Sequence, residues 1–135
     1  HHELEKEGLT PITLAHPTAF ISKNAKIGVG SQILAGSIIG PEVELGQGCI
    51  VNNNANVDHE SFLESGVEIG PGATLCGLIN LGVNAWIGAG ATVLPKIQIG
   101  SNAIVGAGAV VTKNVEKGQT VVGNPAKPLK NRGTK

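Results

Sequence analysis

The sequence predicts an all-β solenoid in which short parallel strands stack into successive coils. Three observations predict it: an aliphatic residue recurs every six positions, the residue two positions earlier is usually small, and glycine often follows. Aromatic residues make up only 2% of the 135 residues, so small and aliphatic side chains must fill the core. Because the 20 glycines follow no collagen-like triplet rule, they indicate a backbone that turns often.

The six-residue period runs without interruption through most of the chain. Every sixth residue from Ile21 to Val111 is Ile, Leu or Val, which makes sixteen positions in register. Residues two apart lie on one face of a strand, so each repeat places one large and one small side chain in the same interior. Strands that recur every six residues are too closely spaced for a sandwich and are typical of a solenoid. Three such sides make a coil of about eighteen residues, so residues 21–116 predict about five triangular coils.

Glycines that directly follow the large aliphatic residue mark the corners of the predicted coils. They are Gly28, Gly40, Gly46, Gly70, Gly82, Gly88, Gly100 and Gly106. Glycine tolerates backbone conformations that strain other residues. We therefore expect each of these glycines to permit a tight bend.

The period is absent at both ends of the chain. Residues 1–20 precede the first repeat as a leading segment, residues 21–116 form the predicted solenoid, and residues 117–135 form a C-terminal extension. The extension contains the motif GNPAK at residues 123–127, within an extended stretch that ends in a turn punctuated by proline.

A polar stretch interrupts the bland repeat between Asn52 and Glu60. In the repeat register Val57 points inward, so His59 should lie at a corner and face solvent or a neighbouring subunit. An imidazole titrates near neutral pH, and a carboxylate such as that of Glu60 can favour its protonated form. Gly77 lies one coil above His59, where a glycine would leave its N–H free to approach a ligand carbonyl. We predict a catalytic site at His59, with a plain surface histidine as the alternative.

The formal net charge is zero, but the charges are unevenly divided along the chain. Residues 1–70 carry nine acidic residues and three lysines, whereas residues 71–135 carry one acidic residue and seven basic ones. The basic half either attracts an anionic ligand or is a solvated tail.

The composition also argues against several classes of protein. No apolar stretch approaches the ~18 residues of a membrane span, so we expect no span and a cytoplasmic location. Basic residues are not interleaved with aromatic ones, which argues against a nucleic-acid partner. Cys49 and Cys76 lack any CxxC or Cys/His spacing and are interpreted as buried structural thiols.

The repeat and the GNPAK motif resemble those of the hexapeptide-repeat acyltransferases, whose fold is a left-handed parallel β-helix. This resemblance implies a homotrimer with active sites between subunits. The VDHE stretch at residues 57–60, followed by LCGLI at residues 75–79, resembles the bacterial nucleotide-sugar N-acetyltransferases of glycan biosynthesis and the related sialic-acid O-acetyltransferases. In that subfamily a nucleotide-sugar-binding domain precedes the β-helix, which implies that residues 1–20 are the end of a linker from such a domain.

The same resemblance implies an enzyme that moves an acetyl group from acetyl-CoA to the amino group of a nucleotide-linked amino sugar. His59 would be the general base, Glu60 would raise its basicity, and the Gly77 N–H would bind the developing oxyanion. No covalent acetyl-enzyme is implied, and Cys76 is a poor candidate nucleophile because no histidine is placed in sequence to activate it. Acetylation of a sugar hydroxyl remains the alternative.

Further site residues also follow from the resemblance. Acetyl-CoA would contact Glu68, Ala89 and Ala107, with Lys127 of the GNPAK motif near its nucleotide end. Glu68 departs from relatives that carry histidine at that position. Asn52 is a candidate for contact with the sugar substrate. No metal is expected.

Two other readings of the solenoid remain. A γ-class carbonic anhydrase needs three histidines on a metal, but beyond His1 and His2 the chain has only His16 and His59. A non-enzymatic solenoid, such as an ice-binding or filament-forming protein, would need either regular threonine rows or an uncapped end. The threonines are scattered, so a filament is the more serious of these alternatives.

Overall fold

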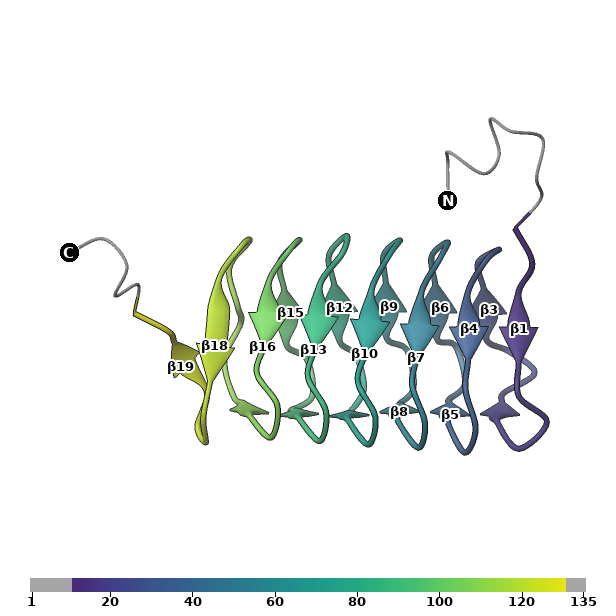
Figure 1. The fold of residues 1–135 in the computed structure, drawn as a ribbon, viewed down its shortest axis with the longest axis horizontal. Coiled ribbons are helices and arrows are strands. Elements are labelled where there is room, and N and C mark those ends of the chain that lie inside the picture. The colour runs from purple at the N-terminus through teal and green to yellow at the C-terminus, as the bar shows by residue number, and fades with distance from the viewer. Residues whose placement is uncertain (1–10, 131–135) are drawn as a thin grey trace.

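The fold is a helical coil of very short parallel strands, seen in a computed structural model that describes residues 11–130. Within this range the chain forms the strands β1 to β19, nearly all of them two residues long. The strands wind around a common axis, and the described part of the chain enters at one end of the coil and leaves at the other (Figure 1).

Three sheets, named A, B and C, form the three sides of the coil. Sheet A contains β1 (Leu14–Ala15), β4 (Gln32–Ile33), β7 (Ile50–Val51), β10 (Glu68–Ile69), β13 (Trp86–Ile87), β16 (Ile104–Val105), β18 (Thr120–Val122) and β19 (Lys127–Pro128). Sheet B contains β2 (Phe20–Ile21), β5 (Ile38–Ile39), β8 (Asn56–Val57), β11 (Thr74–Leu75), β14 (Thr92–Val93) and β17 (Val110–Val111). Sheet C contains β3 (Lys26–Ile27), β6 (Glu44–Leu45), β9 (Phe62–Leu63), β12 (Asn80–Leu81) and β15 (Gln98–Ile99).

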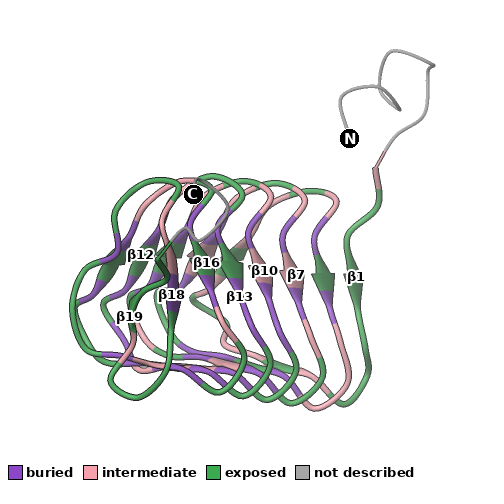
Figure 2. Ribbon diagram, turned by 60° about the vertical axis from the view of Figure 1, so that its left-hand side comes forward, coloured by how far each residue is buried: buried purple, intermediate pink, exposed green. Residues whose placement is uncertain are grey.

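Burial alternates along each coil with the period that the sequence predicts. From β4 to β17, the first residue of each strand is exposed or half-buried and the second is buried, and Figure 2 shows exposed and buried colours alternating along the coils. Two-residue spacing returns a side chain to the same face of a strand. The small residue two positions before each aliphatic one therefore enters the same interior, as Ala55 and Val57 do at 0% exposure.

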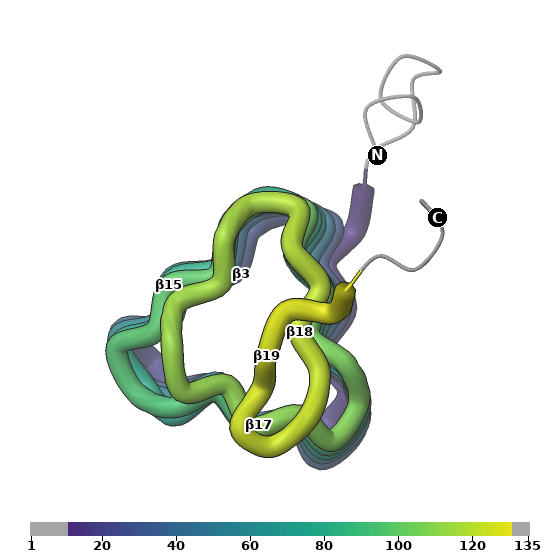
Figure 3. Tube along the Cα trace, turned by 90° about the vertical axis from the view of Figure 1, so that its left-hand side faces the viewer, coloured from purple at the N-terminus to yellow at the C-terminus, as the bar shows by residue number. Residues whose placement is uncertain are grey.

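The coil repeats every eighteen residues and is left-handed. Asn56 of β8 pairs in parallel with Thr74 of β11, and Thr74 pairs with Thr92 of β14. The strands of sheet A run down the front of the molecule in Figure 1, and Figure 3, viewed from the C-terminal end, shows the chain turning clockwise as it approaches the viewer. The predicted eighteen residues per coil and the predicted left-handed sense of the coil are both confirmed.

The solenoid extends beyond the predicted range of 21–116 at both ends, giving about six turns rather than about five. β1 pairs in parallel with β4, although its inward position is Ala15 rather than a large aliphatic residue. At the other end Val121 lies ten positions after Val111, which is not a multiple of six, so β18 pairs with β16 outside the six-residue register. The sequence period missed both strands because neither continues the aliphatic spacing.

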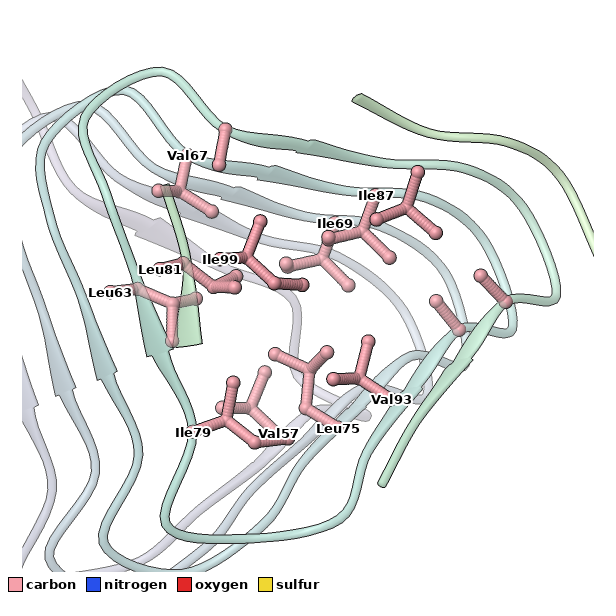
Figure 4. Packing of buried hydrophobic residues seen from close by; sticks show 14 of the residues in the cluster. Val57, Leu63, Val67, Ile69, Leu75, Ile79, Leu81, Ile87, Val93 and Ile99 are labelled. Carbon is pink, nitrogen blue, oxygen red and sulfur yellow. The ribbon is translucent and has the colours of Figure 1, made fainter. Parts of the chain in front are cut away.

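The core is a continuous column of small and aliphatic side chains inside the coil (Figure 4). Ile39, Leu63, Ile69 and Leu75 are all 0% exposed. Polar residues enter this column only where the backbone satisfies them, as when buried Ser31 donates to the Gly46 carbonyl and accepts from the Cys49 N–H. Each coil thus contributes a layer that has no core of its own, and stacking supplies the rest.

Glycine is needed after the aliphatic residues for a different reason from the tight bend that the sequence predicted. A Cβ on Gly28 would lie 2.3 Å from the Gly46 oxygen, and one on Gly88 would lie 2.6 Å from the Ala107 nitrogen. Left-handed backbone instead occurs two residues later in the turn, as at Gly30, where φ is 80°. These glycines are required because successive coils approach one another closely, not because the chain bends there.

Candidate functional site

His59 lies in the turn between β8 and β9, at the edge where sheet B meets sheet C. We call this the B–C edge and define it by the stacked turns 40–42, 58–60, 76–78, 94–96 and 112–114. Val57 is fully buried and Asp58 is exposed, while the side chain of His59 is 45% exposed to solvent. The predicted outward placement of His59 is therefore confirmed.

Neighbouring groups fix the orientation of the His59 imidazole. The Asp58 carboxylate accepts the His59 backbone N–H at 2.7 Å, and the His59 carbonyl accepts the Leu78 N–H from the next coil at 2.9 Å. His59 Nδ1 lies 3.1 Å from Glu60 Oε1. When Nδ1 carries the proton and donates it to this carboxylate, Nε2 is left with its lone pair free, as a general base requires.

Gly77 lies directly against the free nitrogen of that ring. A Cβ at Gly77 would be 2.8 Å from His59 Nε2, and the Gly77 backbone has a φ of 115°. Its carbonyl accepts the Lys96 N–H at 3.1 Å, which holds the peptide in place. Among residues 11–130 the Gly77 N–H has no acceptor, whereas Cys76 and Leu78 on either side donate to Val93 and His59. Gly77 therefore lies close to His59 Nε2, and its own N–H is free to donate to a ligand.

The B–C edge differs from the other two edges in its backbone. Left-handed residues at the third turn position elsewhere are glycine or asparagine, but here they are Glu42, Glu60, Leu78 and Lys96, with φ between 54° and 67°. A non-glycine residue in this conformation costs of order 1–3 kcal/mol, and such strain clusters at functional sites. Sequence reasoning missed Leu78 and Lys96, although the lack of Gly or Asn at the third turn positions 42, 60, 78 and 96, which lie between Asn24 and Asn114 in the same column, was a visible signal.

Cys76 sits beside the site without the features of an activated thiol. Its side chain is half-buried, and burial raises the pKa of the Cys76 thiol, with the Asp58 carboxylate raising it further. A raised pKa lowers the fraction of reactive thiolate at neutral pH. Cys49 is fully buried as predicted, with its pKa also raised by burial, but Cys76 is not, so the expectation of two buried thiols is correct for one of them.

The other residues assigned by resemblance lie away from His59 within one chain. Glu68 is on the outer face of sheet A, where its Oε2 accepts the Trp86 indole N–H at 2.9 Å. Ala89 and Ala107 are exposed at the edge between sheets A and B, with the Gly108 N–H donating to the Ala89 carbonyl at 2.8 Å. Figure 3 shows that this edge is a different corner of the coil from the B–C edge.

Asn52 and Lys127 are also separate from the histidine. Asn52 lies at the edge between sheets A and B, where its carbonyl accepts the Ser37 hydroxyl at 2.6 Å, and sheet B separates it from His59. Lys127 is in β19, at the C-terminal end of sheet A. One chain therefore brings His59, Glu60 and Gly77 together and leaves the expected acetyl-CoA and sugar contacts elsewhere.

A shallow groove adjoins the histidine on the face of sheet B. It has a volume of about 220 Å³ and is lined by Ile38, Asn56, Val57, Asp58, Thr74 and Leu75. His16, which follows β1, is at the edge between sheets A and B and so is remote from His59 in the fold. Within residues 11–130 no three His, Cys, Asp or Glu side chains cluster in a way that could hold a metal ion.

Comparison with known proteins gives the same fold and the same repeat. Residues 79–113 match the family model described as bacterial transferase hexapeptide (six repeats). This stretch of the chain carries the hexapeptide repeat of that family. No curated protein matches the chain significantly.

Several solved hexapeptide-repeat structures are similar to nearly the whole of the described fold. A histidine-to-alanine variant of GDP-perosamine N-acetyltransferase from Caulobacter crescentus, in complex with CoA and GDP-perosamine, has a TM-score of 0.95 and 32% identity over 96% of this chain and 62% of that one. The acetyltransferase domain of PglB from Neisseria gonorrhoeae, in complex with acetyl coenzyme A, has a TM-score of 0.93 and 40% identity over 95% of this chain and 62% of that one. WeeI from Acinetobacter baumannii has a TM-score of 0.80 and 32% identity over 95% and 63% of the two chains.

The chain spans about three-fifths of the length of these similar proteins. In the described part of the chain no helix is long and apolar enough to cross a membrane.

Proposed function

We propose that this chain is the acyltransferase part of an acetyl-CoA-dependent N-acetyltransferase whose acceptor is a nucleotide-linked amino sugar. The observation that carries the proposal is the contact between His59 Nε2 and Gly77, with Glu60 on the opposite nitrogen of the ring. The similarity to acetyltransferase structures with CoA and an amino-sugar nucleotide supports the choice of donor and acceptor.

The proposed reaction is a direct transfer. The sugar amine attacks the thioester carbonyl, and His59 Nε2 removes the proton that the amine gives up as the new C–N bond forms. The Gly77 N–H donates to the oxyanion of the tetrahedral intermediate. When the C–S bond breaks, the thiolate of CoA leaves and takes up a proton from the imidazolium, which returns His59 to its neutral form.

Glu60 is proposed to act through the imidazole and not on the substrate. Its carboxylate holds Nδ1–H and favours the imidazolium that forms during the transfer. The raised pKa of Cys76 supports a mechanism without a covalent acetyl-enzyme.

A complete site is proposed to need two chains. His59 and Gly77 are on the B–C edge, whereas Ala89 and Ala107 are at the edge between sheets A and B. If acetyl-CoA contacts both sets of residues, the second set must come from a neighbouring copy whose edge lies beside the B–C edge. A homotrimer with a site in each of its three clefts satisfies this requirement through cyclic symmetry. An enzyme that draws on the cellular pool of acetyl-CoA is also consistent with a cytoplasmic location.

A structural filament is less well supported by the described fold. Filament growth needs open strands at both ends of the solenoid. At the C-terminal end, Val115 forms a bridge with Ile99, the Ala126 N–H donates to the Val110 carbonyl, and β19 covers β18 in an antiparallel pair. This end offers little free strand for stacking.

The experiment that tests the function measures release of CoA thiol from acetyl-CoA with a panel of nucleotide-linked 4-amino sugars and their 4-hydroxy counterparts. His59→Ala should lower turnover by at least about 100-fold, because a positioned base contributes roughly 10²–10⁴ in rate. His16→Ala removes a histidine from another edge and should leave turnover unchanged. Turnover of hydroxyl sugars alone would replace the proposal with O-acetylation, and equal activity of the two variants would remove His59 from the mechanism.

A further inference from the structure

A hollow on the outer face of sheet C is lined by none of the residues assigned to acetyl transfer. It has a volume of about 380 Å³, and its lining combines an aromatic ring with carboxamide and carboxylate side chains. This volume is within the range of ordinary small-molecule sites, about 300–1,000 Å³. Figure 3 shows sheet C, marked by β3 and β15, as a separate side of the coil from sheet A, marked by β18 and β19.

The irregular last coil bounds the hollow at its C-terminal end. Sheet C ends there with Val115, which forms a single bridge to Ile99 in place of a further two-residue strand. The Asn114 side chain supplies the acceptor that this strand would have provided, because its Oδ1 accepts the Gln98 backbone N–H at 2.9 Å. In earlier coils a main-chain carbonyl has this role. Asn114 is thus folded onto the end of the sheet and lines the hollow.

Three stacked strands each present one outward side chain to the hollow. These are Phe62, Asn80 and Gln98, the first residues of β9, β12 and β15, and all three are exposed. Parallel pairing places Asn80 beside Phe62 and Gln98 beside Asn80. At ~4.8 Å between neighbouring strands, the row is about 10 Å long. It therefore offers a small ligand one apolar ring followed by two evenly spaced carboxamides.

The two carboxamides keep their hydrogen-bonding groups free. Within residues 11–130 neither the Asn80 nor the Gln98 side chain has a hydrogen-bond partner. On sheet A, by contrast, the outward side chains of Glu68 and Trp86 bond to each other at 2.9 Å. Asparagine is also depleted from strands in general, so its place in β12 has no explanation in strand propensity. Because a carboxamide both donates and accepts, the row matches groups that do both, above all hydroxyls.

The charge of the lining argues against the ligands proposed for the catalytic edge. Glu64 and Glu116 contribute two carboxylates, and the lining includes no lysine, arginine or histidine. Glu64 Oε2 accepts the Val83 N–H at 3.1 Å, which fixes that carboxylate beside the hollow. A net negative lining repels phosphates. It therefore disfavours CoA and nucleotides and favours an uncharged ligand rich in hydroxyl groups.

We propose that this hollow binds a short uncharged saccharide, independently of the acetyl transfer proposed at His59. The Phe62 ring provides an apolar surface for one face of a sugar ring. Asn80 and Gln98 donate to and accept from its hydroxyls, and the Glu64 carboxylate accepts from a further one. No step of this binding uses acetyl-CoA, so the hollow is a saccharide site in addition to the proposed transferase site.

The test is titration of the full 135-residue chain with uncharged disaccharides, followed by nuclear magnetic resonance of the side-chain carboxamides. The probes are cellobiose, maltose, lactose and diacetylchitobiose, and glucose is compared with its anionic counterpart, glucuronic acid. Gln98→Ala is compared with Gln32→Ala, since Gln32 is likewise the exposed first residue of a strand but lies in sheet A.

Loss of one hydrogen-bonding side chain predicts that Gln98→Ala weakens binding of the best disaccharide by about 3- to 10-fold. Gln32→Ala should bind that disaccharide as the unmodified chain does. Glucuronic acid should bind at least about 5-fold more weakly than glucose, because the lining is negative. Both variants should keep their turnover of acetyl-CoA, since neither glutamine belongs to the proposed catalytic site.

Three results would overturn the proposal: equal affinity of the two glutamine variants for every probe, binding of glucuronic acid as tight as that of glucose, or no saturable binding of any probe up to about 20 mM. His59→Ala separates this site from the proposed function. Retained disaccharide binding in that variant supports a separate site, whereas its loss would place the saccharide at the catalytic edge and overturn the assignment to sheet C.

Discussion

At the scale of single residues, the site depends on a contact between a ring and a bare backbone. Glycine is required at position 77 for two reasons. A residue with a side chain would be strained at its φ of 115°, and a Cβ there would lie 2.8 Å from His59 Nε2. In the proposed mechanism this close approach brings a base and an N–H donor within reach of one carbonyl group. A glycine at this position would then be part of the proposed site and not a neutral spacer.

Gly77→Ala should therefore lower both the rate of acetyl transfer and the free energy of unfolding. We expect a loss of about 100-fold in kcat, because the added Cβ would displace the His59 ring and the Gly77 N–H from their positions, together with roughly 1–3 kcal/mol of destabilisation from backbone strain. Steady-state kinetics and urea unfolding measure the two effects. Gly118→Ala is the matched control, because Gly118 also has a positive φ of 71° but nothing lies within 4 Å of its added Cβ. Equal activity of the two variants would show that the Gly77 contact has no catalytic part.

The Cys76 thiol provides a second prediction at this scale. Because burial and Asp58 raise its pKa, less of it is thiolate at neutral pH than in a free cysteine, and the difference closes only as the pH rises through the raised pKa. Iodoacetamide should therefore label Cys76 more slowly than a free thiol at pH 7.5. Cys76→Ala should keep turnover within about twofold, since no covalent step passes through the thiol. Trapping of an acetylated Cys76 by mass spectrometry would contradict this mechanism.

At the scale of the elements, the two-residue strands are stabilised by the coils above and below them. Where glycine follows the aliphatic residue, it allows closer stacking, because at Gly28, Gly46 and Gly88 an added Cβ would meet the backbone of the next coil. The other two edges place Gly or Asn at their left-handed turn positions. The B–C edge instead has Glu42, Glu60, Leu78 and Lys96 in left-handed conformations. Left-handed side chains of this kind cluster at functional sites, which supports the proposed site at this edge.

Gly46→Ala tests the stacking argument directly. Its Cβ would lie 2.6 Å from the Ser65 nitrogen, a backbone atom that cannot move without disturbing the coil. We expect a loss of about 2–4 kcal/mol in the free energy of unfolding, typical of overpacking against a rigid neighbour. Gly118→Ala should lose no more than about 1–3 kcal/mol, from strain alone. If chemical denaturation gives equal losses, close approach between coils is not the reason for glycine at position 46.

At the scale of the whole molecule, the edges of one coil divide the expected ligand contacts between them. His59 belongs to the B–C edge, while Ala107 belongs to the edge between sheets A and B, where the Ala107 amide lies against Gly88. A site that uses both sets of residues is complete only when copies associate.

Complementation between two inactive variants tests that assembly. His59→Ala removes the base, and Ala107→Trp fills the opposite wall of the proposed cleft with an aromatic side chain. Co-expressed in equal amounts, the two chains should recover activity at up to about a quarter of the sites, because a cyclic trimer pairs one intact edge of each kind at that frequency. Lack of any recovery in purified mixed trimers would place all contacts within a single chain.

The sequence by itself determined the coil and the position of the histidine. A strict six-residue period specifies which face of each strand is buried, and a slip of one residue would turn every aliphatic side chain outward, so the register of Val57 and the exposure of His59 followed directly. The period carried no information about β1 and β18, because neither strand has the aliphatic spacing.

The tertiary structure alone decided which residues meet. The reason for the corner glycines, the close approach of Gly77 to His59 and the strained B–C edge all depend on how closely one coil lies on the next. Those distances are set by packing between residues eighteen positions or more apart. A periodic pattern specifies that such residues stack, but only the coordinates show which side chains and which bare backbone atoms then face one another.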